Sequence, residues 1–261
     1  MTTTKPKLRK REIALALAAG VMASGAAAII LSESREDDDR EVVRIATNRE
    51  LQLGEFSQLA TVGPQDIVVT TGNVFSVRLE GDPEAVAQLA VSVENGVLTV
   101  EPREGNSFEW WDDDGDVTVH VTAPTLDSIT LAGSGDVEVD RIAGKSFTGT
   151  IAGSGTLELG LIEVQEAKFS IGGSGDVSVA GNADQVTVEV GGSGAVDAEG
   201  LQSRTASVVI AGSGEASLIA REKADVAVMG SGDVHIAGPA TCSVTKIGSG
   251  NVQCDGDQSA D

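Results

Sequence analysis

The segment with the most evident binding chemistry is short and contains both tryptophans of the chain, Trp110 and Trp111. The acids that follow them directly are Asp112, Asp113 and Asp114. Tryptophan rings stack on sugars and cations and often dominate the binding energy of interfaces. The segment is therefore a candidate ligand-binding loop. The favoured interpretation is a hairpin tip whose aromatic rings fold onto the body of the domain.

The only two cysteines, Cys242 and Cys254, lie close together near the C-terminal end. Outside the cytoplasm they could form a disulfide that locks the end of the domain. The alternative is a pair of small, buried apolar side chains. Neither cysteine has an evident base beside it, so we expect no catalytic thiol. We also expect no metal site, because His235 is the only histidine in their segment.

Acidic residues also recur after a repeated tripeptide, Gly-Ser-Gly. Its seven copies begin at Gly133, Gly153, Gly173, Gly192, Gly212, Gly230 and Gly248. Aspartate follows three copies, at Asp136, Asp176 and Asp233, but other residues follow the copies between them. A calcium ladder needs carboxylates on adjacent repeats. We therefore expect these acids to be solvated turn residues, and we expect no cofactor.

The repeat itself predicts the fold. Copies of Gly-Ser-Gly are separated by 18 to 20 residues, and apolar and polar residues alternate on both sides of each copy. Alternation with period two indicates strands with one buried face, and a fixed motif at a fixed period indicates coils that stack. The sequence thus predicts an all-β parallel β-helix, or solenoid, of about 20 residues per coil. By analogy with other parallel crossovers we expect it to be right-handed.

Glycine suits a sharp corner because it reaches positive φ without steric cost. We expect the intervening serines to stack as a ladder of hydroxyl groups. In the last coil Lys246 stands at an inward position, where the open end of a solenoid needs a polar lid.

The segment before the repeats, residues 45–130, shows strand patterns without the period. Asp82 and Pro83 predict the start of a short helix. Asn95-Gly96 lies between two apolar runs and predicts a hairpin.

Five short segments of this region and of the first coil resemble the GIN domain family in the same order. They are Gly-Pro-Gln-Asp-Ile-Val-Val at 63–69, Val-Arg-Leu-Glu-Gly-Asp at 77–82, Glu-Asn-Gly-Val-Leu-Thr-Val at 94–100, residues 117–124, and Leu-Ala-Gly-Ser-Gly-Asp-Val at 131–137. Members of this family are labelled auto-transporter adhesin head domains. The resemblance covers residues 45–254. It implies a β-helical fold related to pectate-lyase-like solenoids, in bacterial envelope proteins, and it implies no established activity or functional residues.

The N-terminus indicates export. A basic flank precedes residues 13–31, which are 19 uncharged residues, and an acidic run follows them. This length spans a bilayer core, and the basic flank places the N-terminus in the cytoplasm. A membrane anchor is therefore expected, and the alternative is a cleaved signal peptide with small residues at 23–28.

These signals divide the chain into five parts. We expect a basic cytoplasmic tail (1–12), an anchor or signal segment (13–31), an acidic linker (32–44), the solenoid domain (45–256) and a polar tail (257–261). Within the domain, residues 45–130 form irregular N-terminal coils with the hairpin, and residues 131–256 form the seven Gly-Ser-Gly coils.

Charge is concentrated in the exported part. The whole chain has a net charge of −22, and residues 45–261 carry ten basic and 33 acidic residues, a net of −23. Such a surface repels nucleic acid and anionic membranes. It could collect divalent or polycationic partners, or it could serve solubility alone.

The function expected from these patterns is that of a non-catalytic envelope protein with an adhesive or structural role. Its domain would lie in the periplasm, anchored to the inner membrane, or be secreted or displayed on the surface after signal cleavage. Its partner would be a glycan or a protein. The alternative is a sugar- or small-ligand-binding module that uses Trp110 and Trp111.

A carbohydrate-active enzyme is less favoured. Such sites need carboxylates gathered in a cleft. The expected outward positions are a mixed set, namely Glu138, Glu158, Ser178, Asp197, Ser217, His235 and Gln253. The connections are too short to build the walls of a groove. His120 and His235 are expected at the surface without partners.

Overall fold

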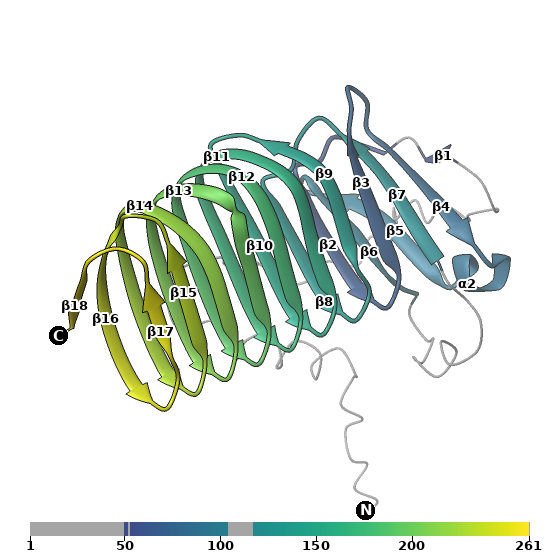
Figure 1. Cartoon of the computed structure of the whole chain (residues 1–261). Helices are drawn as coiled ribbons and strands as arrows, with labels where there is room; N and C mark the ends of the chain where they lie inside the picture. The colour runs from purple at the N-terminus through teal and green to yellow at the C-terminus, as the bar shows by residue number, and fades with distance from the viewer. Residues whose placement is uncertain (1–49, 52, 104–116, 261) are drawn as a thin grey trace, which may run out of the picture. The chain divides into compact units, whose positions relative to one another are not determined.

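The computed structural model describes residues 50–51, 53–103 and 117–260. They belong to one compact unit, Val42–Asp261. Within this unit the strands form coils that stack side by side along one axis (Figure 1). The predicted all-β parallel solenoid is therefore confirmed. The predicted anchor at 13–31 lies outside the described residues. Within the described residues, no helix is long and apolar enough to cross a membrane.

Each coil of the repeat region pairs with the coils before and after it through parallel strands. The strands are β8 (Ser128–Gly133), β9 (Val137–Ala143), β10 (Ser146–Gly153), β11 (Thr156–Gly173), β12 (Asp176–Gly192), β13 (Ala195–Gly212), β14 (Glu215–Gly230), β15 (Asp233–Ala237), β16 (Thr241–Gly248), β17 (Val252–Cys254) and β18 (Gln258–Ala260). Strands such as β11 run without a break from one Gly-Ser-Gly to the next. The polar connections between corners are thus bends within strands, marked by register shifts such as that between Leu159 and Ile162.

The N-terminal part stacks out of sequence order. Its elements are β1 (Glu50–Leu51), β2 (Gln58–Gly63), β3 (Asp66–Thr71), β4 (Ser76–Gly81), α2 (Pro83–Ala87), β5 (Leu89–Glu94), β6 (Val97–Pro102) and β7 (Val117–Ala123). Strand β2 lies between β6 and β8, and β3 lies between β7 and β9. Antiparallel strands β5 and β4 then pair with β6 and β7. This end of the solenoid is therefore closed by strands of opposite direction (Figure 1).

The predicted helix and hairpin are both confirmed. The Asp82 carboxylate accepts hydrogen bonds from the backbone N–H groups of Glu84 (2.8 Å) and Ala85 (3.2 Å), and so caps α2. The β5–β6 hairpin turns at Asn95 (φ 52°) and Gly96 (φ 79°). Positive φ at both central residues gives a turn whose twist matches that of the flanking strands.

The core is a thin stack of aliphatic columns. One column contains buried inward residues from successive coils: Leu131, Ile151, Ile171, Val190, Ile210 and Val228. Aromatic rings are few, and Phe147 packs against Phe169 with ring centroids 6.3 Å apart. Because each residue packs on its equivalents in the neighbouring coils, the strict alternation in the sequence fixes the register of the whole stack.

The Gly-Ser-Gly corners are held together by backbone contacts. The first glycine of each corner has φ between 129° and 157°, and a Cβ atom there would lie 2.0–2.3 Å from the carbonyl oxygen of the equivalent glycine one coil earlier. That same carbonyl accepts the N–H of the corner serine, at 2.8–2.9 Å from Ser154 to Ser249. The hydrogen bonds that stack these corners therefore come from the serine backbone, and the serine side chains lie exposed on the ridge.

A single methyl group tests this packing. Replacing Gly173 with alanine places Cβ against the Gly153 carbonyl at a φ of +139°, and we expect it to lower the free energy of unfolding by about 3 kcal/mol. The control is Gly144→Ala, where Cβ would meet nothing within 4 Å. Urea unfolding measures both, and equal stability of the two variants would contradict the close stacking of corners.

Candidate interaction surface

The strands that follow each corner place one outward residue per coil in a single column. Strand pairing aligns Glu138 with Glu158, Glu158 with Ser178, and Ser178 with Asp197. The same column continues through Ser217 and His235 to Gln253. The sequence predicted this outward set, and the register now shows that its members are neighbours on adjacent coils.

Beside this column the surface is hollowed into an open groove of about 320 Å³, which we call the acidic groove. Its lining residues are Glu138, Val139, Asp140, Glu158, Leu159, Gly160, Ser178, Val179, Ala180, Asp197 and Gly200. The small residues Gly160, Ala180 and Gly200 leave room beside the carboxylates. This open hollow forms where the strands themselves bend, without walls built by long loops.

The carboxylates of the acidic groove differ in how firmly they are held. Asp140 accepts hydrogen bonds from the N–H and hydroxyl of Thr71, at 2.9 and 2.8 Å. Glu138 and Glu158 are exposed and directly opposite each other on adjacent coils. Like charges in this position destabilise a sheet. A bound cationic group would relieve that repulsion.

The face formed by the strands before each corner is different in character. It carries mainly serine and threonine at its outward positions, among them Ser128, Thr130, Thr148 and Thr150. Its charges are paired, since the Lys168 ammonium lies 2.9 Å from the Glu189 carboxylate. This face therefore carries little unbalanced negative charge, in contrast to the acidic groove.

The corner aspartates have a structural role that the sequence did not reveal. The carboxylate of Asp136 accepts the N–H of Thr156 one coil later, at 2.8 Å, and Asp66, Asp176 and Asp233 each do the same for the following coil. After a coil that lacks the aspartate, the N–H donates instead to a corner glycine carbonyl, as Asp176 N–H does to Gly155 at 3.2 Å. These residues are thus hydrogen-bonded caps and not merely solvated. The described residues contain no group of three or more acidic, histidine or cysteine residues suited to a metal ion.

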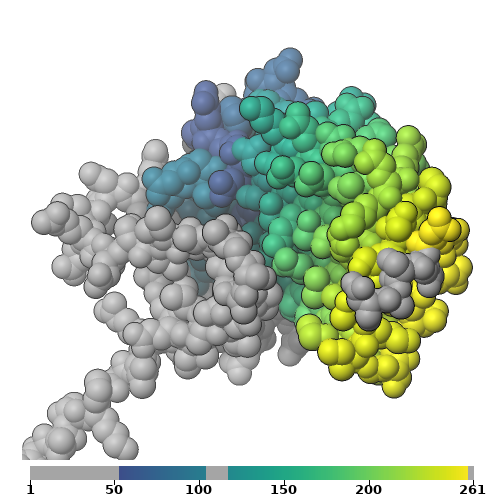
Figure 2. All heavy atoms as spheres, turned by 90° about the vertical axis from the view of Figure 1, so that its left-hand side faces the viewer, coloured from purple at the N-terminus to yellow at the C-terminus, as the bar shows by residue number. Residues whose placement is uncertain are grey.

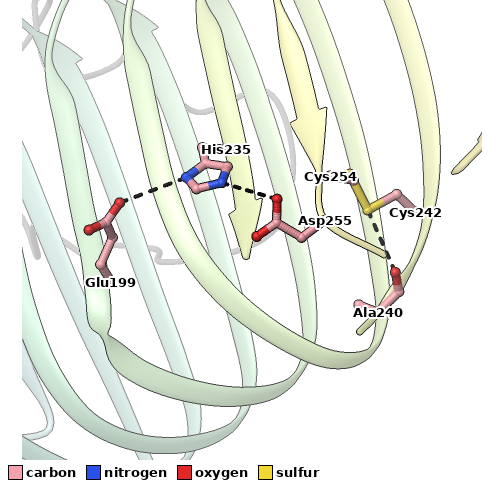
Figure 3. Close-up of polar contacts among 6 residues, drawn as sticks. All are labelled: Glu199, His235, Ala240, Cys242, Cys254 and Asp255. Carbon is pink, nitrogen blue, oxygen red and sulfur yellow. Dashed lines mark hydrogen bonds and ion pairs between the residues drawn. A yellow bond between two sulfur atoms is a disulfide. The ribbon is translucent and has the colours of Figure 1, made fainter. Parts of the chain in front are cut away.

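Both histidines have acidic neighbours, contrary to expectation. His235 lies between two carboxylates, with Nδ1 3.8 Å from Glu199 and Nε2 3.6 Å from Asp255 (Figure 3). His120 Nε2 lies 3.4 Å from Glu80. When protonated, each imidazole would form ion pairs with these carboxylates, near one end of the outward column that contains Glu138, Glu158 and Asp197.

Of the residues singled out from the sequence, the structure joins Cys242 and Cys254 in a disulfide, with Cα atoms 6.6 Å apart (Figure 3). The bond links β16 to β17 in the last coil.

The tryptophan segment lies outside the described residues; it consists of Trp110, Trp111, Asp112, Asp113 and Asp114. The structure therefore does not bring the tryptophan segment together with the acidic groove, and the two stay separate candidates.

Comparison with known families decides where this solenoid belongs. A family model described as "putative auto-transporter adhesin, head GIN domain" matches residues 55–240. The chain belongs to the GIN domain family. This confirms the resemblance seen in the sequence, and the family description supports an adhesive role outside the cytoplasm. No curated protein has a sequence that matches the chain.

Solved structures share the fold at low sequence identity. A crystal structure described as a putative adhesin from Bacteroides fragilis has a TM-score of 0.72 and 22% identity, over 79% of this chain and 95% of that one. Parabacteroides distasonis provides two more, each with a TM-score of 0.63. One is described as a putative lipid binding protein (23% identity, 79% and 95% coverage), and the other as a putative adhesin (19% identity, 80% and 96%). At identities this low, the structural similarity establishes the common solenoid fold alone.

The disulfide gives a test of how the last coil is held. The two cysteines are 12 residues apart, and closing a loop of that size stabilises a protein by about 3 kcal/mol. We expect a reductant to lower the Tm of the wild-type protein and to leave that of Cys242→Ala/Cys254→Ala unchanged. Protein purified from an oxidising compartment should show two thiols only after reduction, and two thiols in the untreated protein would disprove the bond.

Proposed function

We propose that this chain is a non-catalytic adhesive module of the bacterial envelope that binds a cationic partner through the acidic groove. The observation that supports it most is the column Glu138, Glu158 and Asp197, which a rigid stack of strands holds at a fixed spacing. Adjacent coils lie about 4.8 Å apart, so Glu138 and Glu158 are one step apart and Asp197 is two steps beyond Glu158, with Ser178 between them. A polymer that carries positive groups could contact several coils at once.

Charge complementarity supports a cationic partner over an anionic one. Residues 45–261 carry a net charge of −23, which attracts cations over several ångströms and repels nucleic acid and anionic lipids. Because the groove is open, its carboxylates stay hydrated and are screened by salt. The contact should therefore be fast to form and sensitive to ionic strength, as electrostatically steered contacts are.

The proposed location follows from the N-terminal pattern and the family. We propose that residues 13–31 anchor the chain in the inner membrane and that the solenoid lies in the periplasm. Cleavage of this segment would instead release the solenoid to the cell surface or the medium. Both locations are oxidising enough for the Cys242–Cys254 disulfide.

Neutralising the column tests the proposal. Poly-lysine serves as the cationic probe, and full-length protein in a mild detergent is immobilised for biolayer interferometry. We expect Glu138→Gln/Glu158→Gln/Asp197→Asn to bind at least about tenfold more weakly, which is about 1.4 kcal/mol. Asp197→Asn keeps an oxygen that can accept the N–H of Glu199, so the local turn should survive.

The matched control changes the same charge elsewhere. Glu163→Gln/Glu166→Gln/Asp184→Asn removes three exposed carboxylates that are not among the residues lining the groove. It should bind within about twofold of the wild type. An equal loss in both variants would show that only net charge matters and would overturn the groove as the site.

A glycan panel separates the remaining alternatives in the same assay. Glycan binding that survives the groove variant but disappears in Trp110→Ala/Trp111→Ala would place recognition in the tryptophan segment. Cleavage of a glycan that is lost on Glu138→Gln or Glu158→Gln would contradict the non-catalytic role.

A further inference from the structure

The last coil breaks the buried column at one residue. Strand pairing places Lys246 directly after Val228, at the inward position that Leu131, Ile151 and the later aliphatic residues fill in earlier coils. Among the described residues no strand of a further coil pairs at this position, and the lysine is exposed. Its Nζ donates a hydrogen bond to the carbonyl of Gly250 at 2.9 Å.

That carbonyl has a defined partner in earlier coils. In the three coils whose corner is not followed by aspartate, the equivalent carbonyls of Gly155, Gly194 and Gly214 accept an N–H from the following coil, at 3.2, 3.1 and 3.0 Å. Where aspartate follows the corner, its carboxylate accepts that N–H instead. Gly250 is the second glycine of its corner, and no further Gly-Ser-Gly corner follows it among the described residues. The Lys246 ammonium therefore takes the place of the N–H that another coil would have provided.

The two ends of the solenoid are finished differently. The N-terminal end is closed by antiparallel strands and by α2, whereas the C-terminal end is a parallel edge. Among the described residues, β18 pairs with Cys242–Val244 of β16, and no strand pairs with the outer edge of residues 245–248. In Figure 2 the C-terminal end of the solenoid, in yellow, is turned toward the viewer. Ile247 on this edge is 68% exposed.

An uncovered strand edge is a template for pairing with another chain, and an inward-pointing charge is one of the devices that prevent it. We propose that Lys246 is an end cap at the unpaired edge of residues 245–248 and keeps a second copy of this chain from stacking there. Its ammonium would be buried without water if another coil covered it. Burial of an unpaired charge is strongly unfavourable, so the edge stays free.

The proposal predicts what removal of the charge does. Lys246→Ile continues the aliphatic column and exposes an apolar rung beside the unpaired edge. Two such ends can then pair with each other about a two-fold axis. Because the other end of each molecule is closed by antiparallel strands, association should stop at the dimer and should not continue to a filament.

Sedimentation equilibrium of the full-length chain in a mild detergent tests this. We expect the protein mass of Lys246→Ile to double over a concentration range in which that of the wild type stays constant. Lys246→Arg keeps the charge and should stay monomeric. Thr245→Ile adds similar apolar surface at the neighbouring outward position, and it should also stay monomeric.

Three results would overturn the proposal. The first is that Lys246→Ile stays monomeric although circular dichroism shows the strand content of the wild type. The second is that Thr245→Ile dimerises to the same extent as Lys246→Ile, and the third is that the wild type already dimerises through this end. If Lys246→Ile fails to fold, Lys246→Met decides the question, since it keeps an unbranched side chain, with sulfur in place of Cδ, and lacks the ammonium. In the dimer, amide exchange of residues 245–248 should slow at least about tenfold, and unchanged exchange would place the contact elsewhere.

Discussion

The close backbone approach at the Gly-Ser-Gly corner is the contact on which the rest of the structure depends. Each first glycine lies so near its equivalent one coil earlier that no side chain fits between them, and the serine N–H bonds the same carbonyl. This contact sets the distance between coils and their register at one edge. Every column of the solenoid then follows from it: aliphatic inside, acidic on one face, and hydroxyl-rich on the other.

The same constraint accounts for how such a protein can present a surface. A solenoid built from backbone contacts leaves its outward positions free to vary, as the change from Glu158 to Ser178 to Asp197 along one column shows. The core and the corners hold that column rigid without help from its side chains. Recognition can therefore change without a change in fold, which agrees with the solved structures that share this fold at 19–23% identity to the chain.

Much of this fold could be predicted from the sequence because its contacts repeat. The period of Gly-Ser-Gly gave the corners, and the alternation around Ile171 and Val190 gave the inward column. Asn95-Gly96 and Asp82-Pro83 gave the hairpin and the helix, since turn and cap chemistry is local. The threading of β2 between β6 and β8 could not be predicted, because it pairs strands that are far apart in sequence and carry no repeat.

The features of the surface were harder to foresee for a different reason. The acidic groove depends on Gly160, Ala180 and Gly200 lying side by side at a bend, and the register shifts there hide their alignment. The role of Asp136 depends on an N–H that only the stacked coil brings within reach. The aspartates could have been suspected from aligning the coils on their corners, where Asp136, Asp176 and Asp233 occupy one column. The small residues could not, because Gly200 falls one position later than Gly160 and Ala180 in that alignment.

Hydrogen exchange of the corner serine amides tests the central claim most directly. The serine side chains lie exposed on a ridge, and amides of an ordinary exposed loop exchange rapidly. If the N–H groups of Ser154, Ser174, Ser193, Ser213 and Ser231 bond the preceding coil, they should exchange as slowly as those of the neighbouring strands. Rapid exchange at these serines, with the strand amides still protected, would contradict the account.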